Sequence, residues 1–285
     1  MRVFILGTGK SGTTALLYKV AGGLPNCQAF SGGKPGKYLG NYENAVYKHT
    51  YEERKGKSFK LYREHLSKES YDRKIWMARD PRDAAVSRML YRWHRGYSGK
   101  RKQYRAHLNL VLKKEQDPMS VPFYEICRYT GHDGWPRTKT DVFEEEKARY
   151  QQMREFVVGL GNDWFRYRYE DMVDKKNDAL NEYLGFETDA DAEVPSGTGK
   201  DKVVRKKAYG DWRHWYTQDD VALFKPAYLS YMDAVGYDCN DWNLSPKPII
   251  EPKFSSRYMQ SLPHKAKKNL IMRFLDNFSQ RFYPR

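Results

Sequence analysis

Cysteine and long apolar runs are both scarce in this sequence. The 285 residues include three cysteines, Cys27, Cys127 and Cys239, which lie far apart. An odd number of widely spaced cysteines predicts neither a disulfide framework nor a cysteine-based metal site, and favours a reducing compartment. No run approaches the roughly 20 apolar residues of a membrane-spanning helix, and the first one, residues 3–6, leads into a glycine-rich loop instead of a signal-peptide cleavage site. We therefore expect a cytoplasmic protein.

Acidic residues are in the minority. There are 36 of them against 51 lysines and arginines, which gives a net charge of +15. Residues 92–114 hold eight lysines or arginines and no acid. A balance of this kind indicates an anionic cofactor, substrate or surface, and says nothing about the fold. The hydrophobic content of 40%, with 23 tyrosines, is enough for the core of a large α/β domain.

A complete nucleotide phosphate loop is also missing. The stretch "ILGTGKSGTTALL", residues 5–17, resembles one, but the pattern G-x-x-x-x-G-K-[ST] would need a glycine at Phe4. The loop is therefore too short to wrap the β- and γ-phosphates of ATP. It still suits one phosphate, because glycines allow close approach, the N–H groups of a helix start point at an anion, and Lys10 adds a positive charge. The alternative is an ordinary turn between a strand and a helix.

The rest of the chain alternates predicted strands with predicted helices. Residues 31–57 are predicted to be loop with short elements. The strands are expected at residues 2–6, 58–62, 74–78 and 163–171, and the helices at 83–93, 140–161, 177–184 and after Thr13 and Thr217. This order predicts an α/β fold with a central parallel sheet flanked by helices. We expect residues 1–245 to form that domain and 246–285 to be a basic C-terminal extension packing on it.

The stretch "ARDPRDAAVS", residues 78–87, is a candidate for a second phosphate. It places Arg79 at the C-terminal end of a predicted strand, where parallel α/β sheets bind ligands, and Ser87 in the next helix. The alternative is that Asp80 and Asp83 cap that helix while Arg79 forms a surface ion pair.

A third stretch, "VVRKKAYGDWRHWY" at residues 203–216, contains three consecutive cations from Arg205 to Lys207. Such a run is usually a solvated loop. The Gly-Asp-Trp that follows at residues 210–212 is unusual for such a loop, so the run is a further candidate for binding an anion.

The order of these motifs resembles a known family. "KSGTT" after the first strand, "RDPRDAAVS" after a later one, "RYEDMV", and "RK" followed by "GDW" are similar to the sulfotransferases that use 3′-phosphoadenosine 5′-phosphosulfate (PAPS), over about residues 3–237. The resemblance implies a P-loop-like sulfotransferase fold and transfer of a sulfuryl group from PAPS to an acceptor hydroxyl or amine, with no metal. PAPS carries one 5′-phosphosulfate and a separate 3′-phosphate, which would explain the short loop.

The resemblance assigns donor-binding roles residue by residue. The matching positions are Lys10, Ser11, Gly12, Thr13 and Thr14 for the 5′-phosphosulfate, Arg79, Ser87, Arg205 and Lys206 for the 3′-phosphate, and Tyr169 for the adenine. Lys10 is also expected to stabilise charge on the leaving phosphate. Two positions differ from the family pattern, since Ala15 replaces a common tryptophan and Lys207 replaces a glycine.

Transfer also needs a base for the acceptor. The stretch "KLYREHL", residues 60–66, is predicted to close the second strand, where many members of the family carry a catalytic His or Glu. His65 is the first candidate, because imidazole takes up a proton near neutral pH, and Glu64 is the second. His65 could instead be an ordinary surface residue. The acceptor is expected to be a carbohydrate or another hydroxylated small molecule.

Other functions fit the same residues. One is a P-loop nucleoside or small-molecule kinase with Mg²⁺ held by Asp80 or Asp83, although the short loop argues against it. Another is a non-enzymatic protein that binds nucleic acid or another polyanion through residues 92–114, although no nucleic-acid motif is present. Residues 263–285 are basic with apolar residues at helical spacing, which predicts a helix that docks on the domain or contacts a membrane surface.

Overall fold

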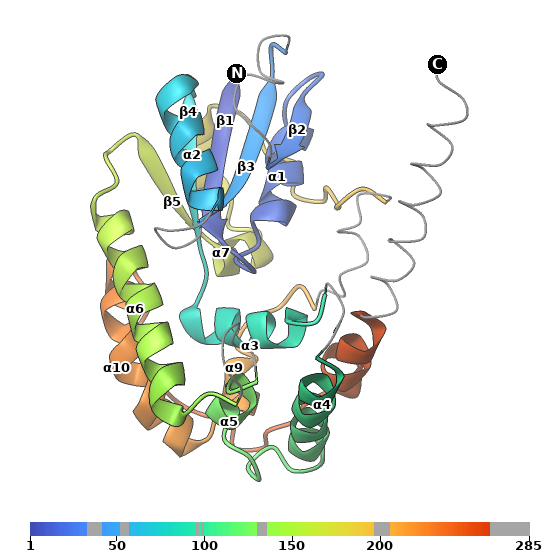
Figure 1. The fold of residues 1–285 in the computed structure, drawn as a ribbon. Coiled ribbons are helices and arrows are strands. Elements are labelled where there is room, and N and C mark those ends of the chain that lie inside the picture. The colour runs from blue at the N-terminus through green and yellow to red at the C-terminus, as the bar shows by residue number, and fades with distance from the viewer. Residues whose placement is uncertain are drawn as a thin grey trace.

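A five-stranded, all-parallel sheet forms the centre of the molecule (Figure 1). The computed structural model describes residues 1–32, 42–51, 57–94, 97, 100–129, 136–196 and 206–262. In spatial order the strands are β2 (Gln28–Ser31), β3 (Ala45–Tyr51), β1 (Arg2–Thr8), β4 (Arg73–Ala78) and β5 (Trp164–Arg168). The predicted α/β fold with a central parallel sheet is confirmed.

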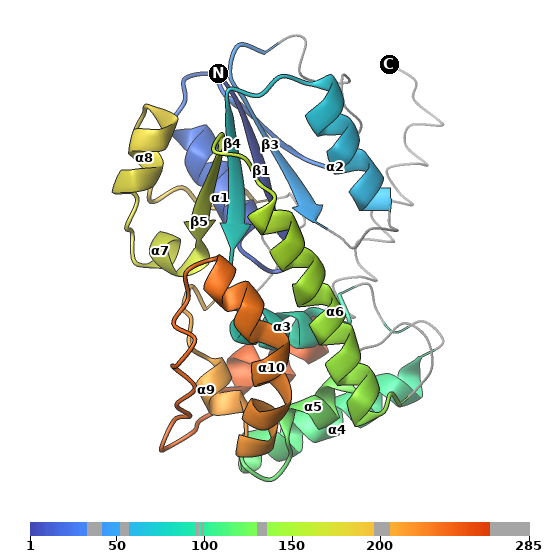
Figure 2. The same ribbon diagram turned by 90° about the vertical axis from the view of Figure 1, so that its left-hand side faces the viewer.

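Helices cover both faces of the sheet, and a further group lies below its C-terminal edge (Figures 1 and 2). One face is covered by α1 (Thr13–Gly22) and α8 (Asp178–Leu184), and the other by α2 (Lys57–Lys68) and α6 (Lys139–Val158). The group below contains α3 (Pro81–Tyr91), α4 (Arg101–Gln116), α5 (Phe123–Cys127), α9 (Trp212–Trp215) and α10 (Gln218–Ala234). The short α7 (Tyr169–Val173) follows β5, and a 3₁₀ turn spans Pro252–Phe254. Among the helices described, none is long and apolar enough to cross a membrane.

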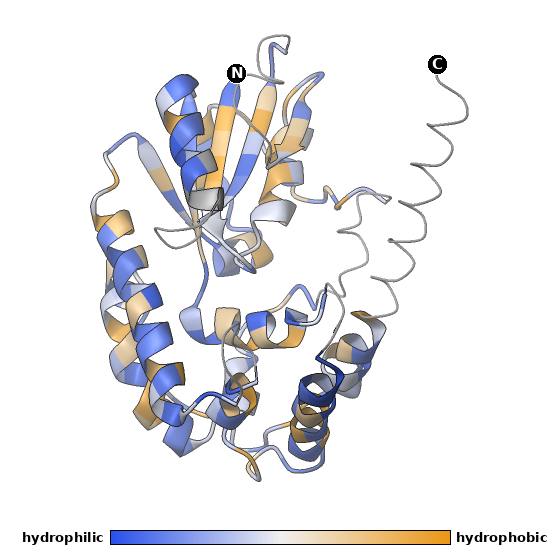
Figure 3. Ribbon diagram, viewed as in Figure 1, coloured by the Kyte–Doolittle hydropathy of each residue, from blue (hydrophilic) through white to orange (hydrophobic). Residues whose placement is uncertain are grey.

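The alternation of side chains along the strands gives the sheet two different cores. Hydrophobic residues run along β1, in the middle of the sheet (Figure 3). Val3 and Ile5 pack toward α1 in a largely aliphatic cluster. Phe4 and Leu6 face the opposite way, into a larger cluster that is rich in tyrosine and tryptophan. That cluster continues from the sheet into the helices below it, so both parts share one core.

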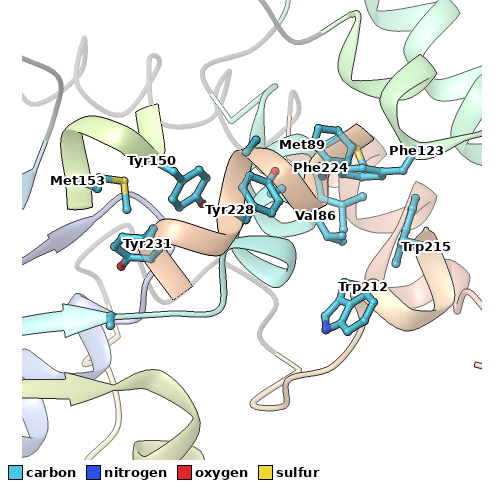
Figure 4. Packing of buried hydrophobic residues seen from close by; sticks show 14 of the residues in the cluster. Val86, Met89, Phe123, Tyr150, Met153, Trp212, Trp215, Phe224, Tyr228 and Tyr231 are labelled. Carbon is cyan, nitrogen blue, oxygen red and sulfur yellow. The ribbon is translucent and has the colours of Figure 1, made fainter. Parts of the chain in front are cut away.

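A buried polar network fixes α3 within this aromatic core. Figure 4 shows Tyr150 of α6 beside Tyr228 of α10. The centroids of the two rings are 4.7 Å apart. Glu146 of α6 accepts a hydrogen bond from the Tyr228 hydroxyl (2.8 Å) and forms an ion pair with Arg88 of α3 (2.6 Å). A buried pair of this kind is destabilising to break, because one charge would be left uncompensated. The position of α3 relative to α6 and α10 is therefore well defined.

Two segments differ from the prediction. Residues 58–62 belong to helix α2 and not to a strand; a run of five residues shows too little periodicity to separate the two, whereas Tyr62, His65 and Leu66 further along follow helical spacing. Residues 31–57, predicted to be mainly loop, contain β3, which pairs directly with β1. Lys48 and His49 make β3 look polar in the sequence, yet both side chains are buried.

The first part of the predicted C-terminal extension contacts the helices below the sheet. Ser256 donates hydrogen bonds from its N–H (2.7 Å) and its hydroxyl (2.9 Å) to the carboxylate of Glu115 at the end of α4. Tyr258, Met259 and Leu262 are buried in the larger cluster. The predicted amphipathic tail, residues 263–285, lies outside the described residues.

Candidate functional site

The glycine-rich loop forms a tight turn at the C-terminal end of β1. The carbonyl oxygen of Thr8 accepts two hydrogen bonds from Ser11, one from the backbone N–H (3.2 Å) and one from the hydroxyl (2.8 Å). Helix α1 then begins at Thr13, with Gly12 before it and no side-chain hydrogen bond capping the helix. The first N–H groups of a helix have no intrahelical acceptors and attract anions. The turn therefore presents the start of α1 at the edge of the sheet.

Two residues of this turn have a left-handed backbone. Lys10 has φ 74° and Gly12 has φ 94°, both in the left-handed region. That conformation costs a non-glycine residue about 1–2 kcal/mol, and such strain clusters at functional sites. The side chain of Lys10 extends toward α3, where its Nζ lies 4.0 Å from the centre of the Tyr91 ring. The loop is thus tied to the helices below the sheet.

Arg79, directly after β4, joins the loop to the end of β5. Its Nη1 donates a hydrogen bond to the carbonyl oxygen of Lys10 (2.9 Å), and its guanidinium carbon lies 4.3 Å from the centre of the Tyr169 ring. The same ring fits against Gly12, where a Cβ atom would lie 2.5 Å from Cδ2 of Tyr169. The Nε of Arg79 is buried without a hydrogen-bond partner in the described part of the chain. Buried donors of this kind are rarely left unpaired, so this one suits an anionic ligand.

Ser87 lies on a face of α3 that borders the glycine-rich loop at one end and the Gly-Asp-Trp motif, residues 210–212, at the other. Asp83, Ser87 and Tyr91 are four residues apart and share that face. At one end is the Tyr91 ring beneath the loop lysine; at the other, the Asp83 carboxylate accepts hydrogen bonds from the N–H groups of Gly210 (2.6 Å) and Trp212 (3.0 Å). Burial, together with the charge of the nearby Asp80, raises the pKa of Asp83. The Gly-Asp-Trp motif is therefore docked beside the face that carries Ser87.

The two acids considered as magnesium ligands already have protein partners. Asp80 caps α3 by accepting a hydrogen bond from the N–H of Arg82 (2.9 Å), and it forms an ion pair with the same side chain (2.7 Å). Asp83 holds the Gly-Asp-Trp segment instead of capping the helix. The capping alternative is thus confirmed for Asp80 and wrong for Asp83, and Arg79 takes part in no ion pair within the described residues.

The late basic run is only partly described. Arg205 lies outside the described residues. Lys206 pairs with Asp211 (2.7 Å) and approaches Glu251 (3.7 Å), and burial opposes its charge while the hydrogen bond with Asp211 favours it, so that its pKa is raised overall. Lys206 therefore reaches the edge of the site with its charge already compensated.

Lys48, on β3, was not predicted from the sequence. Its Nζ donates a hydrogen bond to the hydroxyl oxygen of Thr14 in the first turn of α1 (3.3 Å), and the residue is 9% exposed. The alternation of Tyr47, His49 and Tyr51 with Val46 and Lys48 is the sequence signal for this strand. Lys48 is thus a buried cation beside the loop.

The predicted base His65 lies away from the glycine-rich loop, on the opposite face of the sheet. It is on α2 with 0% exposure, and its Nδ1 is 2.9 Å from the Tyr71 hydroxyl. Its ring packs 4.8 Å from Tyr47 and 4.4 Å from His49, on the sheet face opposite α1. A ring without exposed surface in an aromatic shell cannot meet an acceptor, so this position argues against His65 as the general base.

Glu64, the second candidate, lies beside it on α2. Its side chain is 28% exposed and is 3.9 Å from Nζ of Lys60, one helical turn away. An exposed pair at this spacing contributes little to stability. Glu64 therefore keeps access to solvent that His65 lacks.

The residues that the sequence pointed to thus divide into two groups. The loop residues, Arg79 and Tyr169 meet at one edge of the sheet, with Ser87 on the helix facing it, whereas His65 is buried on the other side. Within the described residues, no three His, Cys, Asp or Glu side chains are grouped as metal ligands would be. Comparison with protein-family models, with curated proteins and with solved structures found no match.

Proposed function

We propose that the protein is a sulfotransferase that binds PAPS at this edge of the sheet and transfers its sulfuryl group to an acceptor hydroxyl. The observation that carries the proposal is Arg79, which holds the carbonyl of Lys10, stacks on Tyr169 and keeps a buried Nε without a partner in the described chain. An arginine so placed suits a phosphate group, which accepts several hydrogen bonds at once. The resemblance of the sequence motifs to the PAPS-dependent family supports the same conclusion.

The site favours two separated phosphates over a triphosphate. The short turn and the start of α1, with Lys10 and Lys48, suit a single 5′-phosphosulfate. Ser87, with the docked Gly-Asp-Trp segment beside it, suits a 3′-phosphate on the α3 side. The Tyr169 ring, packed against Arg79 and Gly12, is the position that the resemblance assigns to the adenine.

In the proposed reaction the acceptor oxygen attacks sulfur in line with the sulfur–oxygen bond to the phosphate. That bond breaks as the new one forms, and negative charge develops on the oxygen that stays with the phosphate. In this proposal Lys10, Lys48 and the N–H groups at the start of α1 stabilise this charge. His65 is buried and Glu64 lies next to it on α2, so we assign the acceptor proton to neither of the two predicted bases.

The cysteines support a proposed location. All three, Cys27, Cys127 and Cys239, are free. Free, widely spaced cysteines are usual in a reducing compartment, and we propose that the protein acts in the cytoplasm.

Donor binding without magnesium is the first test. Adenosine 3′,5′-bisphosphate at 100 times its Kd should stabilise the fold by about 2.7 kcal/mol and raise Tm by roughly 5–10 °C. The shift in Tm should need no magnesium, because fixed cations of the protein, and not a metal ion, neutralise the two separate phosphates. Adenosine 5′-monophosphate and ATP with Mg²⁺ are the comparison ligands in a thermal-shift titration. A larger shift with ATP and Mg²⁺ would reject the sulfotransferase in favour of a kinase.

Replacing Arg79 tests the phosphate assignment. Arg79→Ala should weaken binding of the 3′,5′-bisphosphate by about 2–3 kcal/mol, the usual range for a lost hydrogen bond to a charged group. Binding of the 5′-monophosphate, measured by calorimetry, should weaken much less. Arg79→Lys is the matched control, since it keeps the charge without the planar fork. Its affinity for the bisphosphate should lie between those of the wild type and Arg79→Ala. An equal loss for both ligands would mean that Arg79 only supports the Lys10 carbonyl.

A further inference from the structure

The exposed face of α4 carries positive charge along its length. Residues 101, 102, 105, 109, 112, 113 and 116 are exposed, and the helical period of 3.6 places them on one side of α4. Four of them are cations, Arg101, Lys102, Arg105 and Lys113, and none is an acid. Figure 3 shows the strongly hydrophilic colour at the start of this helix. We call these four residues the α4 strip.

Few contacts of the fold involve the charges of the α4 strip: Arg101 lies over the Tyr97 ring, and Lys113 stands in the last turn of α4, where the helix dipole favours a cation. None of the four residues takes part in an ion pair in the described part of the chain, and the first turn of α4 contains no acid. Arg101 and Lys102 stand at the positive end of the helix dipole, where cations are unfavourable. Helix stability therefore does not explain their position. An anionic partner would compensate these charges.

Aromatic contacts connect the α4 strip to the loop. Tyr91, whose ring lies 4.0 Å from Nζ of Lys10, ends α3. Two residues later, the buried Trp93 donates a hydrogen bond from Nε1 to Nδ1 of His107 on α4 (2.8 Å) and packs edge-on against Tyr104. This contact fixes the first half of α4 against the end of α3. The α4 strip therefore begins next to the helix that borders the proposed donor site.

We infer that the α4 strip binds an anionic polysaccharide that is the acceptor of the proposed sulfuryl transfer. The inference rests on the proposed function. A linear chain of sugars carrying carboxylates offers repeated negative charge to the four cations and repeated hydroxyls to the donor. The stacked rings of Tyr97 and Tyr104, 4.7 Å apart beside Arg101, give sugar rings an apolar surface at the start of the strip. A nucleic acid matches the charge but presents far fewer hydroxyls, and so fits the reaction less well.

The test compares acceptors with labelled PAPS. An unsulfated polymer of alternating uronic acid and hexosamine should accept label, and dextran of equal length should not. Reversing the strip with Arg101→Glu, Lys102→Glu and Arg105→Glu should raise KM for the acidic polymer about tenfold and change kcat less than twofold, because exposed charges act on encounter and not on chemistry. The Tm shift with adenosine 3′,5′-bisphosphate should stay unchanged in this variant.

A charge reversal on α6 is the matched control. Lys139→Glu, Lys147→Glu and Arg154→Glu on α6 change the net charge equally, also at exposed positions, and should leave KM unchanged. Equal labelling of dextran, no labelling of the acidic polymer despite bisphosphate binding, or an equal rise in KM for both reversals would each overturn the inference. So would binding of a single-stranded oligonucleotide that the α4 reversal abolishes while KM for the polysaccharide is unaffected. Failure of the bisphosphate to bind would instead reject the proposed function.

Discussion

Gly12→Ala should weaken binding of adenosine 3′,5′-bisphosphate on the order of 100-fold, about 2.8 kcal/mol, because the added Cβ must displace the turn or the Tyr169 ring that form the proposed site. Gly12 has φ 94°, and a Cβ atom there would lie 2.5 Å from Cδ2 of Tyr169. The backbone strain of about 1–2 kcal/mol and the overlap of about 1–3 kcal/mol together predict a loss of roughly 3 kcal/mol in the free energy of unfolding. Calorimetric titration and urea unfolding measure the two effects.

Gly9→Ala is the matched control in the same loop. Gly9 does not have a positive φ, and the nearest atom to its added Cβ would be Cγ2 of Thr50, 3.9 Å away. This variant should therefore match the wild type in affinity, and in stability within about 0.5 kcal/mol. Combining Gly12→Ala with Tyr169→Leu should recover part of the stability, because the overlap is removed while the φ strain stays. If the two alanine variants bind the bisphosphate equally well, donor binding does not depend on this turn and the site lies elsewhere.

The parts of the fold that could be predicted have strong local signals. Strand β1 is short, apolar and ends at glycine, and α10 begins with a Thr217–Asp220 capping box, so both appear where the sequence places them. Strand β3 was not located within residues 31–57 because Lys48 and His49 look polar in the sequence although they are buried, and residues 58–62 of α2 were mispredicted as a strand because so short a run shows too little periodicity. Tertiary contacts that no local pattern shows keep these side chains away from water.

The candidate site likewise has parts that the sequence predicts and parts that it does not. The loop, Arg79 and Tyr169 follow strands whose C-terminal ends must meet in a parallel sheet, so sequence order alone brings them together. Lys48 depends on the pairing of β3 with β1, and His65 depends on which side of α2 faces the sheet. Both require knowledge of packing between segments distant in the sequence. For that reason the sequence predicted that these residues meet at the end of the sheet, and it did not predict that His65 is buried.

Acid should destabilise the fold through two buried histidines. Burial, with smaller contributions from His65 and Lys48, lowers the pKa of His49 to about 4, and burial together with Arg92 lowers that of His107 to about 3. In the unfolded chain a histidine titrates near pH 6.5, so below that pH the unfolded state binds more protons and stability falls as the pH decreases. Between pH 7 and pH 5 each histidine should remove about 2 kcal/mol from the free energy of unfolding, or about 4 kcal/mol together.

Two substitutions distinguish the contribution of these histidines to the pH dependence of stability from that of the other titrating groups. His107→Gln keeps an acceptor for Nε1 of Trp93, and His49→Phe removes an Nε2 that is buried without a partner in the described residues. Each should reduce the loss between pH 7 and pH 5 by about 2 kcal/mol in urea unfolding, and the double variant by about 4 kcal/mol. Asp83 acts in the opposite direction, because its raised pKa makes protonation favour the folded state as the pH falls, but this contribution cancels between each variant and the wild type. A wild type and double variant with the same pH dependence would show that neither ring is held neutral by burial.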